Sequence, residues 1–215
     1  MTYLEAVNRV LIRLREEEVT TVNQNPYSKL IGTFVNDAKR MVEDAWDWSS
    51  LRTTITVTTQ ADVFSYNLIG ANSSFKTLNV LNDTKNCFME HIPAFEMSNQ
   101  YLIQPVVEGS PTQYTWNGFT AEGNAIVDVY PKPNSVEYLR FNLVQRRDEY
   151  TNDSDVFYVP TQAVIQLAQG FAMEERGETG GQSSGAMIQL GRSTLADAIA
   201  FDVARFPTEL IWRDV

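Results

Sequence analysis

The first fifty residues carry apolar side chains at the three- and four-residue spacing that is typical of amphipathic helices. The first stripe consists of Leu4, Val7, Val10, Leu11 and Leu14. A second helix is expected to begin at Asn25-Pro26, because Asn caps free backbone N–H groups and Pro fits the first helical turn. Its apolar face consists of Leu30, Ile31, Phe34, Val35, Ala38, Met41, Val42 and Ala45, closed by Trp46 and Trp48. The pattern therefore predicts two helices up to Trp48.

From Ser49-Ser50 onward the apolar positions alternate with polar ones. Ile55 and Val57 face one side and the neighbouring threonines face the other, which is typical of a half-buried strand. Further strands are expected at Phe64–Leu68, Thr77–Leu81, Phe88–Ile92, Pro111–Trp116, Ala125–Tyr130 and Glu137–Val144. Asn117-Gly118 is a hairpin turn signal. Many short strands separated by Gly, Asn and Pro predict an antiparallel sandwich or barrel.

The helical spacing returns after Val159-Pro160. The third stripe consists of Ala163, Val164, Leu167, Ala168, Phe171 and Ala172. A loop is expected from Gly177 to Gly185, followed by a last helix from Ala186 to Arg205. The helix is expected to end at Phe206-Pro207, because proline disfavours helix in the residue before it.

These patterns together predict an α+β protein. Its expected architecture is a four-helix layer made from both chain ends, with an inserted antiparallel β-sandwich or barrel module and an extended C-terminal tail. The helical domain is expected to comprise residues 1–50 and 151–205, and the β module residues 51–150. Residues 206–215 form the C-terminal arm.

Composition narrows the class of function. Aromatic residues make up 11% of the 215 residues, which fits an ordered globular chain. The net charge of -10 disfavours a protein that grips DNA, because phosphate binding needs a basic surface. The two basic spots, Lys39-Arg40 and Arg146-Arg147, are interpreted as solvated surface. No apolar run approaches the ~18 residues of a membrane span. Cys87 is the only cysteine, which excludes an internal disulfide and fits a reducing cytoplasm.

No set of residues predicts catalysis, a metal or a cofactor. His91 and Cys87 would form a nucleophilic pair only with a surrounding motif, which is missing, so His91 is interpreted as a strand residue. Asp153-Ser154-Asp155 lacks the glycine and distal glutamate of a calcium loop and predicts a turn. The segment from Gly177 to Gly185 lacks the lysine of a phosphate loop. Glu174 and Glu175 are adjacent on a helix and therefore point in different directions.

The order helix, helix, β insert, helix, helix, tail resembles the head-to-tail adaptor proteins of short-tailed phages, which include the tail tubular protein A family. The resemblance covers nearly the whole chain. The segments that carry it are Tyr3–Arg15, Ala45-Trp46-Asp47-Trp48, Gly109–Tyr114, Asn117-Gly118, Tyr130–Pro133, Arg146-Arg147, Asp153-Ser154-Asp155 and Val159-Pro160.

The resemblance implies a structural virion protein with no catalytic residues, made in the host cytoplasm. It implies a ring of about twelve copies below the portal protein of the capsid, which extends the DNA channel and carries a tail or nozzle protein. DNA would pass through without specific binding, and the acidic balance agrees with this. The C-terminal arm carries Phe206, Leu210, Ile211 and Trp212, which are expected to anchor between portal subunits. Packing of these side chains on the chain's own helices is the alternative.

Two other classes of function stay open at this point. One is a wall-degrading virion enzyme, which would need a buried carboxylate pair in a groove. The other is a glycan- or receptor-binding module, suggested by Tyr114, Trp116 and Phe119 near one turn. Core packing with one exposed ring is the favoured interpretation of these aromatic residues.

Overall fold

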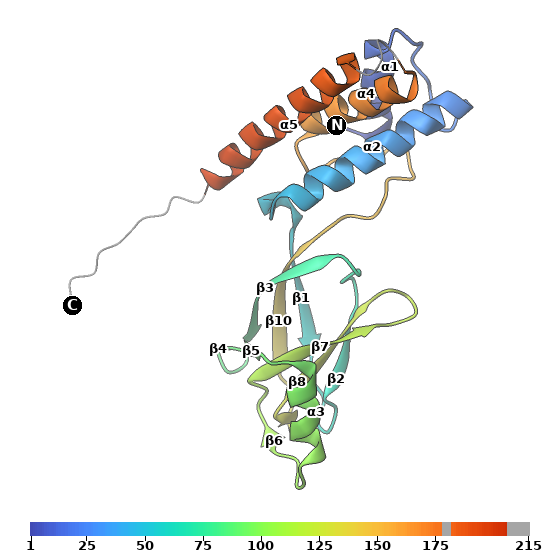
Figure 1. Cartoon of the computed structure of the whole chain (residues 1–215). Coiled ribbons are helices and arrows are strands. Elements are labelled where there is room, and N and C mark those ends of the chain that lie inside the picture. The colour runs from blue at the N-terminus through green and yellow to red at the C-terminus, as the bar shows by residue number, and fades with distance from the viewer. Residues whose placement is uncertain (178–181, 206–215) are drawn as a thin grey trace, which may run out of the picture. The chain divides into compact units, whose positions relative to one another are not determined.

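The described residues fall into two units that differ in secondary structure. The structure is a computed structural model and describes residues 1–177 and 182–205. The helical unit takes its described residues from both chain ends, which are residues 1–50, 147–177 and 182–205. The β unit comprises Leu51–Arg146. Each unit is described by itself below (Figure 1).

The described residues of the helical unit form four helices, each of which overlaps one of the predicted helical segments. They are α1 (Tyr3–Arg13), α2 (Pro26–Ala45), α4 (Thr161–Glu175) and α5 (Gln182–Val203). Thr2 caps α1 in a reciprocal pair with Glu5, and Asn25 caps α2 in the same way with Ser28. These side chains bind backbone N–H groups that have no partner within a helix, and α2 begins where the sequence predicts.

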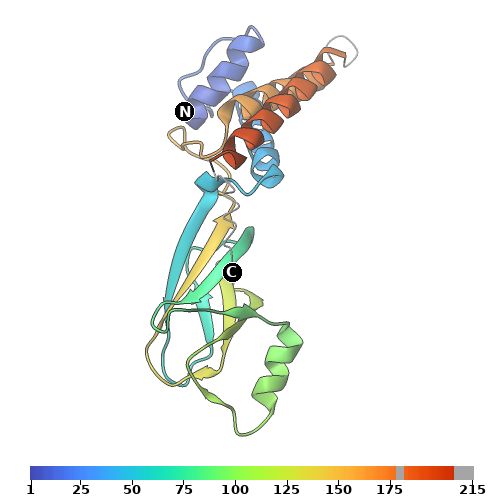
Figure 2. The same ribbon diagram turned by 90° about the vertical axis from the view of Figure 1, so that its left-hand side faces the viewer.

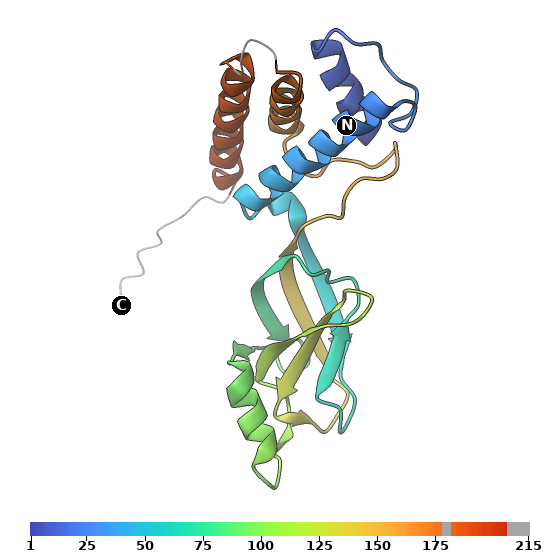
Figure 3. The same cartoon turned by 45° about the vertical axis from the view of Figure 1, so that its right-hand side comes forward.

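Helix α4 is the centre of the helical unit, because α1, α2 and α5 all pack on it. Nine of its fifteen residues are buried. Helices α1 and α5 lie on opposite sides of α4, as Figures 2 and 3 show. A helix surrounded in this way needs apolar residues on most of its surface, and α4 has them.

Glycines bring α4 and α5 close together. A Cβ atom at Gly170 would lie 2.5 Å from a side-chain atom of Ile188, and one at Gly191 would lie 2.9 Å from the side chain of Leu167. Helix α5 is therefore held by backbone approach. Among residues 183–203 only Ser184, Gly191 and Asp202 are buried. Helix α5 begins at Gln182 and not at Ala186, so the expected loop from Gly177 to Gly185 is shorter than predicted.

A buried lysine of α2 binds the segment that follows the β unit in the sequence. Lys39 is 2% exposed, and its Nζ donates to the carbonyl oxygens of Arg147 and Asp148 at 2.7 and 2.8 Å. Asn36 donates to the carbonyl of Tyr150 and accepts from the N–H of the same residue. The interpretation of Lys39 as solvated surface was therefore wrong, whereas Arg40 is exposed.

The β unit contains two four-stranded sheets and one two-stranded sheet. The first sheet has the order β1-β10-β3-β4 and is antiparallel, and the second has the order β2-β8-β7-β5. The strands of the first sheet are β1 (Arg52–Thr58), β3 (Phe75–Asn82), β4 (Cys87–Phe88) and β10 (Tyr138–Gln145). The strands of the second sheet are β2 (Ser65–Leu68), β5 (Glu90–His91), β7 (Gln113–Phe119) and β8 (Ala125–Tyr130). Strands β6 (Glu108–Gly109) and β9 (Lys132–Pro133) form the small sheet.

Both four-stranded sheets contribute to one apolar cluster. Phe141, Leu139 and Leu143 come from β10, and Val127 and Val129 come from β8. All five are fully buried, as the alternating pattern of these strands predicts. The α+β class is thus confirmed, while the sheets do not close into a barrel. The pairings β5–β7 and β6–β9 are parallel, so the expectation of a purely antiparallel module was wrong.

Three local features of the β unit differ from the sequence prediction. Helix α3 (Ala94–Leu102) was not predicted, and it packs on β7 and β8 (Figure 2). The strand expected at Phe88–Ile92 is two short strands, β4 and β5, in different sheets. Asn117-Gly118 is a bulge inside β7 and not the hairpin turn, because Gly118 has φ +86° and the register shifts between Trp116 and Phe119.

The two glycines of α5 that differ in their surroundings give a matched test of the α4–α5 contact. Gly191→Ala should lower the free energy of unfolding by roughly 1–3 kcal/mol, because its Cβ would lie 3.2 Å from the backbone nitrogen of Leu167. Gly185→Ala should raise it by about 0.5–1 kcal/mol, since no atom lies within 4 Å and alanine favours helix. Urea denaturation measures both. Equal effects of the two substitutions would contradict the close packing.

Candidate protein-interaction sites

The last turn of α5 is anchored by a buried carboxylate immediately before the C-terminal arm in the sequence. Asp202 is 4% exposed. It accepts hydrogen bonds from the Oγ of Ser49 at 2.7 Å, from the N–H of Ser49 at 3.2 Å and from the Nε1 of Trp46 at 3.2 Å. We call Trp46, Ser49, Asp202 and Arg205 the arm base. This contact fixes the position of the helix end from which the arm continues.

The charge of Asp202 is maintained by these donors. Burial by itself raises the pKa of a carboxyl group, but the hydrogen bonds from Ser49 and Trp46 lower the pKa of Asp202 below its ordinary value of 3.8. A negative charge in the last turn of a helix is also opposed by the helix dipole. A buried, charged Asp202 therefore costs free energy at this position. Its hydrogen bonds to Trp46 and Ser49, which follow α2, offset that cost.

Arg205 continues the arm base to the end of the described chain. Its Nη1 lies 3.2 Å from the Oγ of Ser49 and 3.4 Å from the Oδ1 of Asp202. Its guanidinium carbon lies 5.4 Å from the centroid of the Phe201 ring. The ring of Phe201 is 68% exposed, so the arm base presents an aromatic surface beside a cation.

A pocket of about 450 Å³ lies next to the arm base. Its lining includes Trp48, Tyr158, Pro160, Ala198 and Phe201. Tyr158 is half exposed, and the guanidinium of Arg147 lies 4.7 Å from its ring centroid. Exposed aromatic rings beside arginines are typical of protein-binding surfaces, so this pocket suits a peptide or protein segment.

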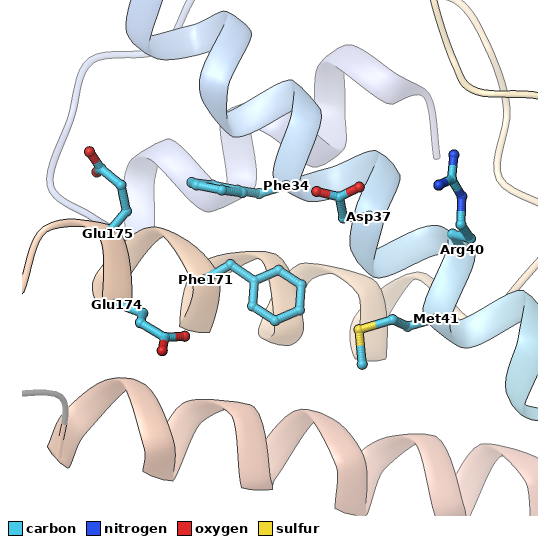
Figure 4. Close-up of a pocket in the computed structure, with 7 residues that line it drawn as sticks. All are labelled: Phe34, Asp37, Arg40, Met41, Phe171, Glu174 and Glu175. Carbon is cyan, nitrogen blue, oxygen red and sulfur yellow. The ribbon is translucent and has the colours of Figure 1, made fainter.

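A second pocket of about 600 Å³ lies between α2 and α4 (Figure 4). We call it the groove, and its lining residues are Phe34, Asp37, Arg40, Met41, Phe171, Glu174 and Glu175. Phe34 and Phe171 make an edge-to-face contact with their ring centroids 6.4 Å apart. Met41 and Phe171 point toward the side of the groove on which α5 lies (Figure 4). An apolar floor with charged residues around it is again suited to a protein partner.

The predicted portal-binding residues Phe206, Leu210, Ile211 and Trp212 lie outside the described residues. The structure instead describes the arm base that precedes them. No local sequence pattern indicates the arm base, because Ser49 and Asp202 are 153 residues apart in the chain. It also missed the groove, although Glu174 and Glu175 were singled out. Both glutamates line it and both are exposed.

The structure separates the residues that had been considered for catalysis. Cys87 is in β4 and His91 is in β5, which belong to different sheets. His91 is exposed and lies against Tyr114 with ring centroids 5.4 Å apart, so it is a strand side chain as interpreted. Among residues 1–177 and 182–205, no group of three or more His, Cys, Asp and Glu side chains is arranged to hold a metal ion.

The acidic turn before α4 has a structural role. Asp155 accepts hydrogen bonds from the N–H groups of Thr151 and Asn152, both at 2.9 Å. These bonds lower the pKa of Asp155 below 3.8. The Oδ1 of Asp153 accepts from the N–H of Val22 at 3.0 Å. The prediction of a turn is confirmed, and the turn also binds the segment between α1 and α2.

The aromatic residues considered for glycan binding are core residues with one exposed ring. Tyr114 is 6% exposed, and Trp116 packs against the apolar cluster. Phe119 is 49% exposed. The favoured interpretation is therefore confirmed. No helix in the described part of the chain is both long and apolar enough to cross a membrane.

The two pockets have apolar linings with charged residues at their edges. Pockets of this kind are typical of proteins that bind other proteins. The chain belongs to the SU10 adaptor protein family, whose model matches residues 1–206. The protein is thus a structural phage protein, a virion component that interacts with other virion proteins. No curated protein sequence matches the chain.

Asp202→Asn should lower the free energy of unfolding at pH 7 by about 1–3 kcal/mol, because the donors of Ser49 and Trp46 lose a buried, charged acceptor. The folded-state pKa lies below 3.8, so this contribution is complete above that pH and is lost as the pH falls through the folded-state pKa. The difference between the two proteins, measured by urea denaturation, should therefore stay constant from pH 7 down toward pH 3.8 and shrink as the pH falls below that value. Asp197→Asn, an exposed site on the same helix, should show neither effect.

Proposed function

We propose that the protein forms a ring below the portal, joins the phage head to its tail and extends the DNA channel. The observation that carries this proposal is the match of the SU10 adaptor family to residues 1–206, which include both described units. The proposed partners are a portal protein above the ring and a tail or nozzle protein below it. The resemblance to head-to-tail adaptors implies a closed cyclic ring of about twelve copies, which matches the symmetry of the portal.

The two units support a division of roles within the proposed adaptor. We assign residues 1–50 and 151–205 to a helical domain that contacts the portal, and residues 51–150 to a β module that carries the tail. The β unit exposes several large apolar side chains that suit a further protein partner. They are Ile69, Phe88, Phe95, Leu102 and Ile103, each at least 69% exposed.

The charge of the chain supports a conduit for DNA. The formal net charge is -10, so a ring of such chains carries a strongly negative field. Like charges repel the phosphates of passing DNA, which prevents binding along the channel. The same charge opposes association of free subunits.

The C-terminal arm is the proposed anchor on the portal. Phe206, Leu210, Ile211 and Trp212 are apolar, and burying them stabilises a complex. Ordering the arm backbone costs free energy of similar or larger size, so side-chain burial alone does not suffice. We therefore propose that the arm also gains backbone hydrogen bonds to the portal, as an added strand does. In a ring, each docked arm raises the effective concentration of its neighbours.

Deletion of residues 206–215 tests the anchor. The shortened protein should keep the circular dichroism spectrum of the parent and should lose binding to portal rings in a sedimentation assay. A free peptide of residues 206–215 should bind portal much more weakly than the whole protein, because it lacks the avidity of the ring. If the folded, shortened protein assembles on portal with the affinity of the parent, the arm is not the anchor.

Ring formation should depend on the portal. Light scattering of the protein alone should give the mass of a monomer, and negative-stain images of the mixture with portal should show a ring on the portal. The reason is the net charge of -10 on each subunit, which disfavours free rings. A stable ring in the absence of portal would contradict this expectation.

A further inference from the structure

The groove is bordered by three carboxylates that make no ion pair within the described residues. Asp37, Glu174 and Glu175 are exposed, while the floor of the groove consists of Phe34, Met41 and Phe171. The cation of the groove, Arg40, is already paired with Glu149. The groove therefore presents an apolar floor with a negative rim, and its complement is an apolar side chain between two cations.

The outer face of α1 carries that complement. Arg9, Ile12 and Arg13 are spaced by three and four residues, so they lie together on one side of the helix. We call them the α1 stripe. Ile12 is 53% exposed between two exposed arginines. Arg13 donates one hydrogen bond to Gln169 at 3.3 Å, and Arg9 makes no ion pair among the described residues.

The α1 stripe and the groove are different faces of the helical unit. The buried residues of α1 pack toward α2 and α4, whereas the stripe lies on the exposed side of α1, with Arg13 at the edge that reaches Gln169 of α4. The groove lies between α2 and α4, and Met41 points toward the side on which α5 lies (Figure 4). Two different, complementary faces on one chain are what a head-to-tail contact between copies requires, and repetition of such a contact closes a ring.

We propose that the α1 stripe of one copy docks into the groove of the next copy. Ile12 contacts the floor formed by Phe34, Met41 and Phe171, and Arg9 and Arg13 pair with the carboxylates of the neighbour. This inference rests on the proposed ring and identifies the contact between its subunits. Charge complementarity favours a second copy as the occupant, because a chain of net charge -10 presents few basic faces and one of them fits this rim.

Cross-linking of the subunits on portal rings tests the contact. In a Cys87→Ser background, Ile12→Cys and Met41→Cys are combined in one chain and treated with a short bis-maleimide. A head-to-tail contact should give a ladder of covalent multimers beyond the dimer, whereas either single-cysteine variant should stay monomeric. Dimers alone, or the absence of cross-links in rings seen by microscopy, would overturn the proposal. Cross-links of Met41→Cys to Trp212→Cys in place of the ladder would show that the arm occupies the groove.

Charge reversal provides a second test with a built-in rescue. In the variant Arg9→Glu/Arg13→Glu, both the α1 stripe and the groove are acidic. In the variant Glu174→Arg/Glu175→Arg, the groove becomes basic and the stripe stays basic. Each alone should form portal-bound rings with a yield at least tenfold below the parent. An equimolar mixture should recover most of the yield, because every contact in an alternating ring then joins opposite charges. Arg192→Glu, an exposed reversal on α5, should leave the yield unchanged.

The outcomes separate this inference from the proposed function. If the parent itself forms no ring on portal, the proposed function fails. If the parent forms rings and both reversal variants form them with the yield of the parent, the ring stands and the assigned contact is wrong. Rescue by the mixture but not by either variant alone supports the contact, since a folding defect in one variant is not repaired by mixing.

Discussion

The ammonium group of Lys39 holds together parts of the chain that are more than a hundred residues apart. It donates to the carbonyl oxygens of Arg147 and Asp148, lies 3.3 Å from the Oε1 of Glu43 and faces the ring of Tyr150 at 4.6 Å. Burial lowers the pKa of Lys39, and the charge of Glu43 opposes this shift. Removing one partner of such a buried pair costs about 3–5 kcal/mol, because the other charge stays buried. The contacts of the helical unit are therefore complete only with the segment that follows the β unit in the sequence.

Helix α5 has a different relation to the helical unit, because α4 is the helix on which it packs. It is held by close backbone approach at Gly170 and Gly191 and by the carboxylate of Asp202 at its last turn. Apart from Ser184, the other side chains of residues 183–203 are half-buried or exposed, including Leu190 and Phe201. Helix α5 is thus attached at its glycines and at its last turn. Its exposed apolar side chains leave a surface for a partner. This arrangement fits a helix whose proposed task is to lead an arm onto another protein.

Local patterns predicted most elements, and long-range contacts explain the misses. The apolar stripes placed α2 and α4, and the alternation of Leu139, Phe141 and Leu143 placed β10. Helix α3 was missed because only Met97 of its nine residues is buried, so it has no stripe. The pattern around Asn117-Gly118 is shared by turns and bulges, and the hydrogen bond from Asn117 to Asp128 selects the bulge. Lys39, the arm base and the groove depend on residues brought together by folding, which no local pattern contains.

The energetics of the proposed ring contact explain why portal should be needed. Subunits of charge -10 repel one another over about one Debye length, ~8 Å at physiological salt, whereas an ion pair acts at contact distance. Exposed ion pairs between Arg9 or Arg13 and carboxylates contribute about 0–1 kcal/mol each, and Ile12 adds one partly buried side chain. Such a contact is too weak to overcome the entropy of association by itself. When arms dock on a symmetric portal, neighbouring subunits are held at high effective concentration, and the same weak contact then suffices to set their register.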